Sequence, residues 1–453
     1  MSWVSAANSS LLTDLYELTM AASYHSRGMN DEATFDLFVR ELPERRNFLV
    51  VCGIEQALEY LEGLHFDAES IAYLESLGMF DASFLDHLTT FRFTGDVWAM
   101  NEGEIAFEKE PLLRVTAPLI EAQMVETFLL NCVTFQTMVA SKAARVSLAA
   151  DGKRFLDFSL RRDHGADAGL KAARAAYIAG ASATSNVLAG KMYGIPVSGT
   201  MAHSYVMVFP TEMDAFRAYA RDFPEQAVLL IDTFDVAEGA RRAVAVANEL
   251  AGEGIALRGV RIDSGDLGPL AKEVRAILDE GGLTDTTIIL SGDLDEYRVQ
   301  EMLDADVPVD AFGVGTQMGT SADSPFLGGV YKLVAEKGEP KVKLSTGKIT
   351  LPGLKQVYRF SSGGSFQHDL IALEEERIEG GKALLARAMK DGMRLRGPEP
   401  IVEVRARCLE ALNQLPPGLR VLSDAETSYA VHTSAPLQEL ARRARDHLGA
   451  NPV

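Results

Sequence analysis

The chain has 453 residues, of which 47% are hydrophobic and 24% are charged. This composition excludes wholesale disorder, collagen-like repeats and a coiled-coil rod, and the length predicts two or three domains. The formal net charge of −20 argues against a surface that coats DNA, RNA or an anionic membrane, although a small anion could still bind in a locally basic cleft.

The cysteines and the N-terminal segment indicate the cellular compartment in which the protein is expected. Cys52, Cys132 and Cys408 are odd in number and lack metal-binding spacing, so we expect three buried free thiols in a reducing compartment. The first twenty residues lack the basic and apolar regions of a secretion signal. No apolar run reaches the roughly 18 residues of a membrane span, and we therefore expect a cytoplasmic protein.

The first 110 or so residues mix short helices with strands, and a long helical stretch follows. A helix capped by Thr13 or Asp14 is predicted over Leu18–Tyr24, and the alternation in ATFDLFVRELP predicts a half-buried strand. A helix is expected from Asn47 to Leu64. The stretch 94–118 predicts two or three antiparallel strands, and a long helical stretch follows over 121–150.

From Phe155 the pattern changes to short apolar runs, most of them separated by amphipathic helical stretches. This alternation predicts parallel strands in an α/β barrel or a doubly wound sheet. The expected strands are FLDFSL (155–160), IPVSGT (195–200), AVLLIDT (227–233), RGVRIDSG (258–265), TIILSGD (287–293), AFGVGT (311–316) and VYKLV (330–334). From about Lys341 the chain returns to polar strands and a helical tail, which we expect to pack back on the N-terminal part.

Polar residues follow these strands, where an α/β barrel opens to its ligand. They are Arg161, Arg162, His203, Thr233, Asp235, Asp263, Ser264, Asp266, Asp293 and Thr316. Glycine turns let backbone N–H groups approach phosphate oxygens, arginine forks suit phosphate or carboxylate, and paired aspartates suit hydrated Mg²⁺ or sugar hydroxyls. The residues therefore predict an enzyme of phosphorylated sugars or nucleotides.

Each motif also has a structural interpretation. RIDSGD could be only a capped helix start, with Asp263 or Ser264 as the N-cap, but an arginine inside an apolar strand favours function. The turn from Gly313 to Thr316 could equally be an ordinary strand-to-helix connection. His203 could be a structural histidine, although its small-residue turn SGTMAHS favours a functional role modestly.

Together the motifs resemble the nicotinate phosphoribosyltransferase family. The resemblance runs through TDLYELTM (13–20), FDLFVRELP, FLDFSLRRDHG, SNVLAGKMYGIPVSGTMAHS, GVRIDSGDL, AFGVGTQMGTS and VYKLV. It implies an α/β fold: the irregular parallel α/β barrel of type II phosphoribosyltransferases over 131–345, plus an α+β open-faced sandwich domain. The latter would comprise 1–130 and the C-terminal segment 346–453 packed back on it.

The resemblance also implies the reaction. Nicotinate would attack phosphoribosyl pyrophosphate to give nicotinate mononucleotide and pyrophosphate, coupled to ATP hydrolysis and requiring Mg²⁺, as the entry step of NAD salvage. It implies a head-to-tail homodimer with shared active sites, and no nucleic acid or membrane partner. The related nicotinamide enzyme has an aspartate at the place where this chain reads Thr184-Ser185-Asn186. An aspartate can accept a hydrogen bond from the carboxamide of nicotinamide but repels the carboxylate of nicotinate, so its absence favours nicotinate.

Site residues are assigned through the same resemblance. The catalytic residues would be His203, which ATP phosphorylates, and Asp263 beside the ribose. Nicotinate would contact Tyr16 (from the neighbouring subunit), Phe158, Arg161, Thr200 and Arg261. Phosphoribosyl pyrophosphate would contact Arg261, Asp263, Ser264, Gly292, Asp293, Gly313, Gly315 and Thr316.

Several alternatives stay open at this point. The nearest is a phosphoribosyltransferase for nicotinamide or for quinolinate, which should need extra basic residues. A sugar-phosphate barrel aldolase or isomerase would usually offer a Schiff-base lysine, for which Lys332 is the one obvious candidate. A non-enzymatic ligand-binding protein would not need intact His203, Arg261 and Asp263. Whether Asp163 faces the site or solvent is open, and it weakens the case for Arg162 more than for Arg161.

Overall fold

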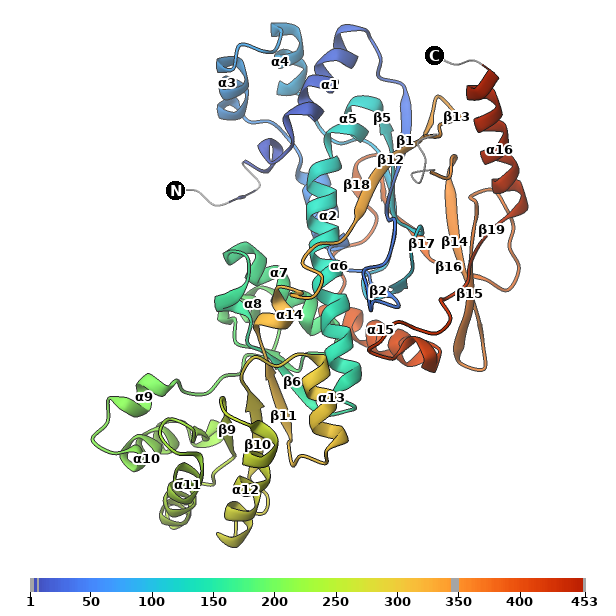
Figure 1. Cartoon of the computed structure of the whole chain (residues 1–453). Helices are drawn as coiled ribbons and strands as arrows, with labels where there is room; N and C mark the ends of the chain where they lie inside the picture. The colour runs from blue at the N-terminus through green and yellow to red at the C-terminus, as the bar shows by residue number, and fades with distance from the viewer. Residues whose placement is uncertain (1–3, 6–7, 344–349, 451–453) are drawn as a thin grey trace. The chain divides into compact units, whose positions relative to one another are not determined.

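A computed structural model of the chain describes residues 4–5, 8–343 and 350–450, the last three of these by their backbone alone. The chain forms two compact units, unit 1 from Met1–Ser141 with Phe326–Val453 and unit 2 from Lys142–Pro325 (Figure 1). No helix within the described ranges is long and apolar enough to cross a membrane.

Unit 1 contains most of the antiparallel strands. Its seven-stranded sheet has the order β13-β12-β1-β5-β3-β17-β18, its four-stranded sheet the order β16-β14-β15-β19, and β2 pairs with β4. The strands are β1 (Glu32–Val39), β2 (Leu49–Val50), β3 (Asp96–Met100), β4 (Ile105–Ala106), β5 (Pro111–Pro118), β12 (Gly329–Glu336), β13 (Glu339–Pro340), β14 (Lys355–Ser362), β15 (Ser365–Leu373), β16 (Lys382–Ala383), β17 (Leu385–Lys390), β18 (Met393–Arg394) and β19 (Val431–Thr433).

Both chain segments of unit 1 contain helices. They are α1 (Leu15–Ser26), α2 (Ile54–Gly63), α3 (Ala68–Ser76), α4 (Ala82–Thr89), α5 (Leu119–Met124), α6 (Glu126–Ala149), whose last turns belong to unit 2, α15 (Ile401–Gln414) and α16 (Ala435–Ala450), with short 3-10 turns η1 (Ser9–Leu11) and η4 (Pro417–Leu419). The predicted first helix, the long helical stretch and the C-terminal helix are therefore confirmed.

Two expectations for unit 1 are wrong in part. The helix expected from Asn47 begins only at Ile54, because Leu49–Val50 pairs as β2 and Gly53 adopts a left-handed φ of 93°. The strand β1 was expected to be half-buried, yet seven of its eight residues are buried. Neighbouring strands β12 and β5 flank it on both sides, so β1 is a central strand.

The run VYKLV does not belong to the parallel sheet as predicted. It forms β12, which pairs antiparallel with β1, with Tyr331 opposite Leu37. Tyr331 is buried, stacks on Phe35 with ring centroids 4.8 Å apart, and donates a hydrogen bond to the carbonyl of Ala122. An apolar run alone does not distinguish a parallel strand from a buried antiparallel one, because both faces are covered in each case.

Unit 2 contains a six-stranded parallel sheet with the order β7-β6-β11-β10-β9-β8. The strands are β6 (Arg154–Asp157), β7 (Ala183–Thr184), β8 (Val228–Leu230), β9 (Gly259–Ile262), β10 (Thr287–Ser291) and β11 (Ala311–Val314). The helices are α7 (Ala166–Ile178), α8 (Val187–Tyr193), α9 (His203–Met207), α10 (Glu212–Asp222), α11 (Val236–Ala251), α12 (Leu267–Glu280), α13 (Glu296–Asp304) and α14 (Thr316–Gly319), with 3-10 turns η2 (Leu160–Arg162) and η3 (Pro224–Gln226).

Five of the seven predicted strands of the α/β region therefore lie in this sheet. The run IPVSGT does not form a strand and makes only an isolated bridge between Val197 and Thr184. Its proline lacks an N–H donor, and three of its six residues, Ser198, Gly199 and Thr200, are small and polar or lack a side chain, which leaves few apolar side chains to pack a strand. The α/β class is confirmed, with a parallel sheet whose helices alternate with its strands.

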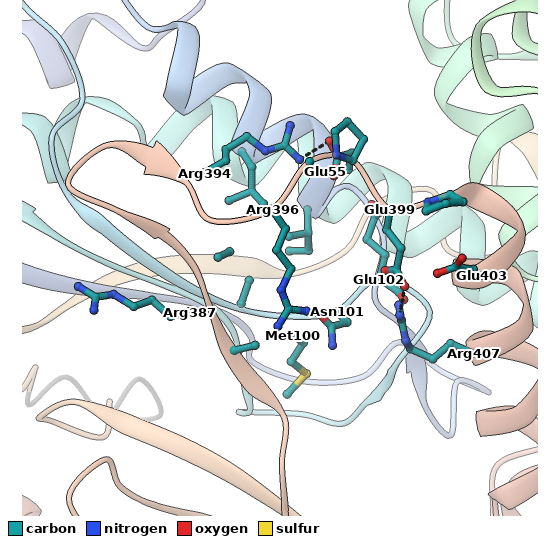
Figure 2. A pocket seen from close by; sticks show the side chains of 18 residues that line it. Glu55, Met100, Asn101, Glu102, Arg387, Arg394, Arg396, Glu399, Glu403 and Arg407 are labelled. Atoms are coloured by element: carbon teal, nitrogen blue, oxygen red, sulfur yellow. Dashed lines mark hydrogen bonds and ion pairs between the residues drawn. The ribbon is translucent and has the colours of Figure 1, made fainter.

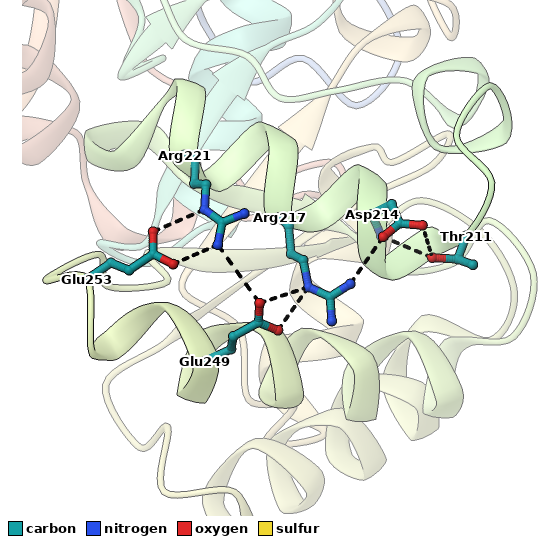
Figure 3. A network of polar contacts seen from close by, with 6 residues as sticks. All are labelled: Thr211, Asp214, Arg217, Arg221, Glu249 and Glu253. Atoms are coloured by element: carbon teal, nitrogen blue, oxygen red, sulfur yellow. Dashed lines mark hydrogen bonds and ion pairs between the residues drawn. The ribbon is translucent and has the colours of Figure 1, made fainter.

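Exposed ion pairs join helices α10 and α11 (Figure 3). Arg217 donates to Glu249 of α11 at 2.8 Å, and Arg221 donates at 2.6 Å to Glu253, which lies just after α11. Thr211 caps α10 by accepting from the amide of Asp214 at 3.2 Å. Exposed pairs contribute only about 0.2–1 kcal/mol each, so apolar packing beneath them supplies most of the stability of this helix pair.

A buried charge cluster fixes the start of α13. Lys142 lies 2.6 Å from Glu296 and 2.8 Å from Asp323, and Arg145 donates to Glu296 at 2.8 Å. Burial alone would raise the pKa of Glu296, but the two cations outweigh it and lower that pKa. All three cysteines are buried free thiols, as predicted.

Candidate active site

A pocket of about 240 Å³ opens at the carboxyl ends of the strands of unit 2. It is lined by Phe158, Arg161, Arg162, Asp263, Ser291, Gly292, Asp293, Gly313, Gly315 and Thr316. These residues follow or end β6, β9, β10 and β11, which are neighbours in the sheet. Parallel strands bring their carboxyl ends to one edge, so residues as far apart in sequence as Phe158 and Thr316 meet there.

The turn after β10 requires glycine at position 292. Gly292 has a φ of 110°, and a Cβ at this position would lie 2.1 Å from the carbonyl oxygen of Asp263. The next residue, Asp293, also adopts a left-handed φ of 53° and accepts a hydrogen bond from Gln317 at 3.2 Å. The turn is therefore compact, and its backbone packs directly against the end of β9.

The turn after β11 approaches the Phe158 ring. A Cβ on Gly313 would lie 2.7 Å from that ring, and one on Gly315 would lie 3.0 Å from the Phe158 carbonyl oxygen. Helix α14 starts at Thr316, directly after Gly315. With only four residues this helix is too short for a substantial dipole. A ligand would therefore contact the backbone N–H groups of the turn, which no Cβ of Gly313 or Gly315 covers.

Arg261 occupies the inner end of the site. Its Nη1 donates to Thr200 Oγ1 at 2.5 Å, its Nη2 lies 3.5 Å from Asp263, and its guanidinium carbon lies 5.9 Å from the centre of the Phe158 ring. The side chain is 12% exposed, and its Nε has no partner among the described residues. Burial lowers the pKa of Arg261, while Asp263 and Asp232 partly oppose that effect.

Two residues that the sequence interpretation missed hold Asp263 in place. Ser291 donates to Asp263 Oδ1 at 2.5 Å, and Asp232 Oδ2 accepts from the Asp263 amide at 3.0 Å. Asp232 also accepts from Ser264 at 2.6 Å, whereas its Oδ1 is buried without a partner in the part of the chain that the structure describes. Its position directly after the apolar run VLLI was the available signal.

His203 begins helix α9 and lies next to the loop after β8. Its Nδ1 is 3.2 Å from Thr233 Oγ1. Asp235, by contrast, caps helix α11 by accepting from the amide of Glu238 at 2.9 Å, so this aspartate has a structural partner. Asp266 is the N-cap residue of α12, although it makes no side-chain cap bond, so neither Asp263 nor Ser264 is that helix's N-cap.

The orientation of Asp163 is resolved. Its Oδ2 accepts from Ser159 at 3.1 Å, and its carboxyl group lies against Gly169 and Gly319, so the side chain points into unit 2. Burial first, and the nearby Asp157 second, raise the pKa of Asp163 to about 6. Arg161 and Arg162 are both exposed and line the pocket, so Asp163 supports their loop from behind and does not neutralise them.

Tyr16 lies in unit 1, at the start of α1. The side chain is 45% exposed and donates a hydrogen bond to Glu126, and burial with the nearby carboxylates raises its pKa. The adjacent Glu17 is fully buried and accepts from the amide of Thr127 at 2.8 Å, and burial raises its pKa to about 7. Lys332, the Schiff-base candidate, lies in β12 of the same unit, 3.9 Å from Glu126.

Most of the predicted site residues thus meet in unit 2. Eight of them line the pocket itself: Phe158, Arg161, Asp263, Gly292, Asp293, Gly313, Gly315 and Thr316. Arg261, Thr200 and Ser264 connect to it through the hydrogen bonds given above. Their roles in binding and catalysis stay predictions. Within the described ranges, no group of three or more His, Cys, Asp or Glu side chains could hold a metal ion by itself.

Glycine turns, arginines and a fixed carboxylate at the open edge of a parallel sheet define an α/β protein with a site suited to phosphorylated ligands. Two family profiles match the chain, the nicotinate phosphoribosyltransferase (NAPRTase) N-terminal domain over residues 11–134 and the NAPRTase family over 154–341. The chain belongs to the nicotinate phosphoribosyltransferase family.

Individual relatives agree with this assignment over 83–98% of this chain. The nicotinate phosphoribosyltransferase pncB2 of Mycobacterium tuberculosis is 44% identical over 98% of this chain and 96% of its own. The nicotinate phosphoribosyltransferase of Bacillus subtilis is 43% identical over 83% of this chain and 78% of its own. The crystal structure of human nicotinic acid phosphoribosyltransferase superposes with a TM-score of 0.85 and 31% identity, covering 95% of this chain and 99% of that one.

Proposed function

We propose that this protein transfers the phosphoribosyl group of phosphoribosyl pyrophosphate to the ring nitrogen of nicotinate and couples that transfer to ATP hydrolysis. The products are nicotinate mononucleotide, pyrophosphate, ADP and phosphate. The observation that carries the proposal is the convergence of Asp263, Gly292 and Gly315 on one pocket in a chain of this family.

The two glycine turns bind the 5′-phosphate. Their backbones are uncovered because Gly292 and Gly315 lack a Cβ, so N–H groups can reach phosphate oxygens. Thr316 adds a hydroxyl donor on the same side of the pocket, and Arg161 and Arg162 bring positive charge to its rim. These cations locally reverse the field of an otherwise acidic protein.

Asp263 stabilises the reacting sugar. Displacement at the anomeric carbon develops positive charge, and a fixed carboxylate lowers the energy of that state because it needs no reorganisation. Two hydrogen bonds hold this carboxylate in position: Ser291 donates to it, and the amide of Asp263 donates to Asp232. The nicotinate ring stacks on Phe158, and Arg261 pairs with its carboxylate. No general base is needed, since the ring nitrogen of nicotinate has a free electron pair.

The residues present fit a Mg²⁺ ion shared with the substrate. Mg²⁺ usually takes one or two carboxylates together with substrate phosphates and retains waters. Asp232 offers a buried Oδ1 that has no partner in the described parts of the chain, and Asp263 lies beside it. When bound, the ion spreads the charge of the departing pyrophosphate. Asp232 and Asp263 would supply the carboxylate ligands of the ion, and its charge would offset their repulsion of the diphosphate.

His203 accepts the phosphoryl group of ATP. An imidazole nitrogen attacks the γ-phosphorus, the bond to ADP breaks, and water later releases phosphate from the nitrogen. Thr233 fixes the ring through Nδ1. We expect ATP labelled in the γ-phosphate to give acid-labile label on the protein, and His203→Ala to abolish it. The exposed His164 in the same unit supplies the control, because His164→Ala should keep the label.

A second copy of the chain completes the site. Helix α8 exposes the apolar residues Val187 (71%), Leu188 (52%) and Met192 (56%), a surface that a partner subunit would cover. The neighbouring subunit brings Tyr16 to the nicotinate. We expect Leu188→Glu to shift the protein from dimer to monomer in sedimentation and to lower activity. A dimer that persists in Leu188→Glu and in Val187→Glu would contradict this interface.

The decisive experiment is product analysis with nicotinate, nicotinamide and quinolinate offered together, with and without ATP. We expect nicotinate mononucleotide as the main product, in larger yield when ATP is present. The absence of an aspartate from residues 184–186 supports nicotinate as the substrate. Two of these residues have structural partners: Thr184 donates to Asp157, and Asn186 caps α8. Equal use of nicotinamide would contradict the specificity, and quinolinate use would favour the nearest alternative.

A further inference from the structure

Unit 1 contains a second pocket, of about 360 Å³, whose volume lies in the range of small-molecule sites. Its walls come from α2, the end of β3, β17, the segment 394–400 and the first turns of α15 (Figure 2). Four arginines and four glutamates line it: Arg387, Arg394, Arg396, Arg407, Glu55, Glu102, Glu399 and Glu403. We call it the α15 pocket. None of these residues belongs to the candidate active site.

Two arginines of the α15 pocket are fixed by ion pairs. Arg394 donates to Glu55 at 2.5 Å, and its side chain is only 10% exposed. Arg407 pairs with Glu399 and also donates to the carbonyl of Glu102 at 2.6 Å. These pairs make the walls rigid and leave little net charge of their own. Their cost in side-chain entropy and desolvation means that they are weak evidence for a purely stabilising role.

Two further charges in the α15 pocket are not neutralised. Arg396 and Glu403 make no side-chain hydrogen bond or ion pair with any described residue, and they do not pair with each other. The Arg396 side chain lies across the pocket with its guanidinium beside Met100 and Asn101 (Figure 2). Glu403 lies on the other side, near Glu102 and Glu399 (Figure 2). One cavity therefore presents a free cation and a free anion at separate places.

A buried donor adds to the cationic side. The Nε of Arg394 is buried and has no hydrogen-bond partner among the described residues. A buried N–H group left unpaired costs about 1–3 kcal/mol, and most such groups are satisfied by protein, water or a ligand. An acceptor that a ligand brings between Arg394 and Arg396 would reduce this cost.

We propose that the α15 pocket binds a small zwitterionic metabolite, with a carboxylate or phosphate against Arg396 and Arg394 and an amino group against Glu403. A simple anion would satisfy the arginines but would leave Glu403 on the opposite side without a cationic partner. An amine alone would leave Arg396 unmatched. The apolar side chains of Ile54, Leu58 and Met100 suit a short hydrocarbon body between the two charged ends.

The experiment measures binding of the free amino acids and of phosphoethanolamine, each added singly to the full-length protein. Saturation-transfer NMR reports contact, and thermal denaturation reports stabilisation of the folded protein. Each binder is compared with its decarboxylated amine and its N-acetyl derivative, which lack one of the two charges. We expect at least one probe to bind, and both derivatives to bind more than about tenfold more weakly.

Matched variants locate the site. Arg396→Ala and Glu403→Gln should each weaken binding by more than about tenfold, because each removes one charged partner. Arg377→Ala and Glu379→Gln, at exposed positions of the same unit outside the pocket, should leave it unchanged. The proposal is overturned if no probe binds at about 10 mM, which corresponds to a binding free energy near −3 kcal/mol. Binding that survives Arg396→Ala, or equal binding of the N-acetyl derivative, would also overturn it.

Discussion

Replacing Gly292 by alanine tests whether the backbone of the β10 turn places Asp263. The added Cβ would lie 2.1 Å from the Asp263 carbonyl oxygen, so these atoms must separate by more than 1 Å to reach the ordinary contact distance of 3.4 Å. A displacement of about 1 Å at a reacting group can cost about 100-fold in rate. We therefore expect kcat/KM for phosphoribosyl pyrophosphate to fall by about that factor.

A second glycine separates this displacement from backbone strain. Gly282 in the same unit also has a left-handed φ, of 80°, but a Cβ there would meet no atom within 4 Å. Alanine at either position costs about 1–2 kcal/mol from the left-handed φ alone. Gly282→Ala should therefore lower the melting temperature slightly and leave kcat/KM unchanged. If both variants lose stability equally and neither loses activity, the close approach of the two turns has no role in placing Asp263.

Three further substitutions test the chemistry and the electrostatics of unit 2. Arg261→Lys keeps the positive charge but loses the guanidinium fork, including the donor to Thr200. Steady-state kinetics should therefore show kcat/KM reduced by about 10- to 100-fold. Unchanged kinetics would place this arginine outside the site. Glu296→Gln removes one of the two carboxylates that neutralise the buried Lys142, so urea unfolding should show the free energy of unfolding lowered by about 3–5 kcal/mol. A decrease below about 1 kcal/mol would mean that Asp323 alone neutralises Lys142. The pKa of Asp163 is raised from 3.8 to about 6 in the folded protein, so its contribution to stability is greatest at low pH and is lost as pH rises through 6. Asp163→Asn should accordingly raise the melting temperature at pH 7.5 more than at pH 4.5, and an equal change at both values would contradict the burial of this carboxyl group.

The sequence predicted the candidate site better than it predicted the connections of the strands. The run GVRIDSGD places Arg261, Asp263 and a turn at the end of an apolar strand, and the rule that parallel strands share an open edge brings in Gly292 and Gly315. This reasoning needs only local pattern and sheet polarity. It does not extend to Thr200 and His203, because the run before them makes only an isolated bridge and no strand of the sheet.

Long-range pairing could not be predicted in the same way. An apolar run such as VYKLV carries no information on the direction of its neighbours, and β12 pairs with a strand almost 300 residues earlier. The buried pair of Lys142 and Glu296 likewise joins residues 154 positions apart. Asp232 escaped notice because its function depends on the amide of Asp263, which only the folded sheet brings within 3.0 Å.

The pairing of β12 with β1 has a consequence for how the chain folds during synthesis. Before residue 326 leaves the ribosome, the seven-stranded sheet has only β1, β5 and β3, since its other strands follow unit 2 in the sequence. At about 5–20 residues per second, translation of the 184 residues of Lys142–Pro325 takes roughly 10–40 s. Throughout that interval the edge of β1 that later pairs with β12 has no partner strand, and an unpaired edge of this kind can pair with another chain.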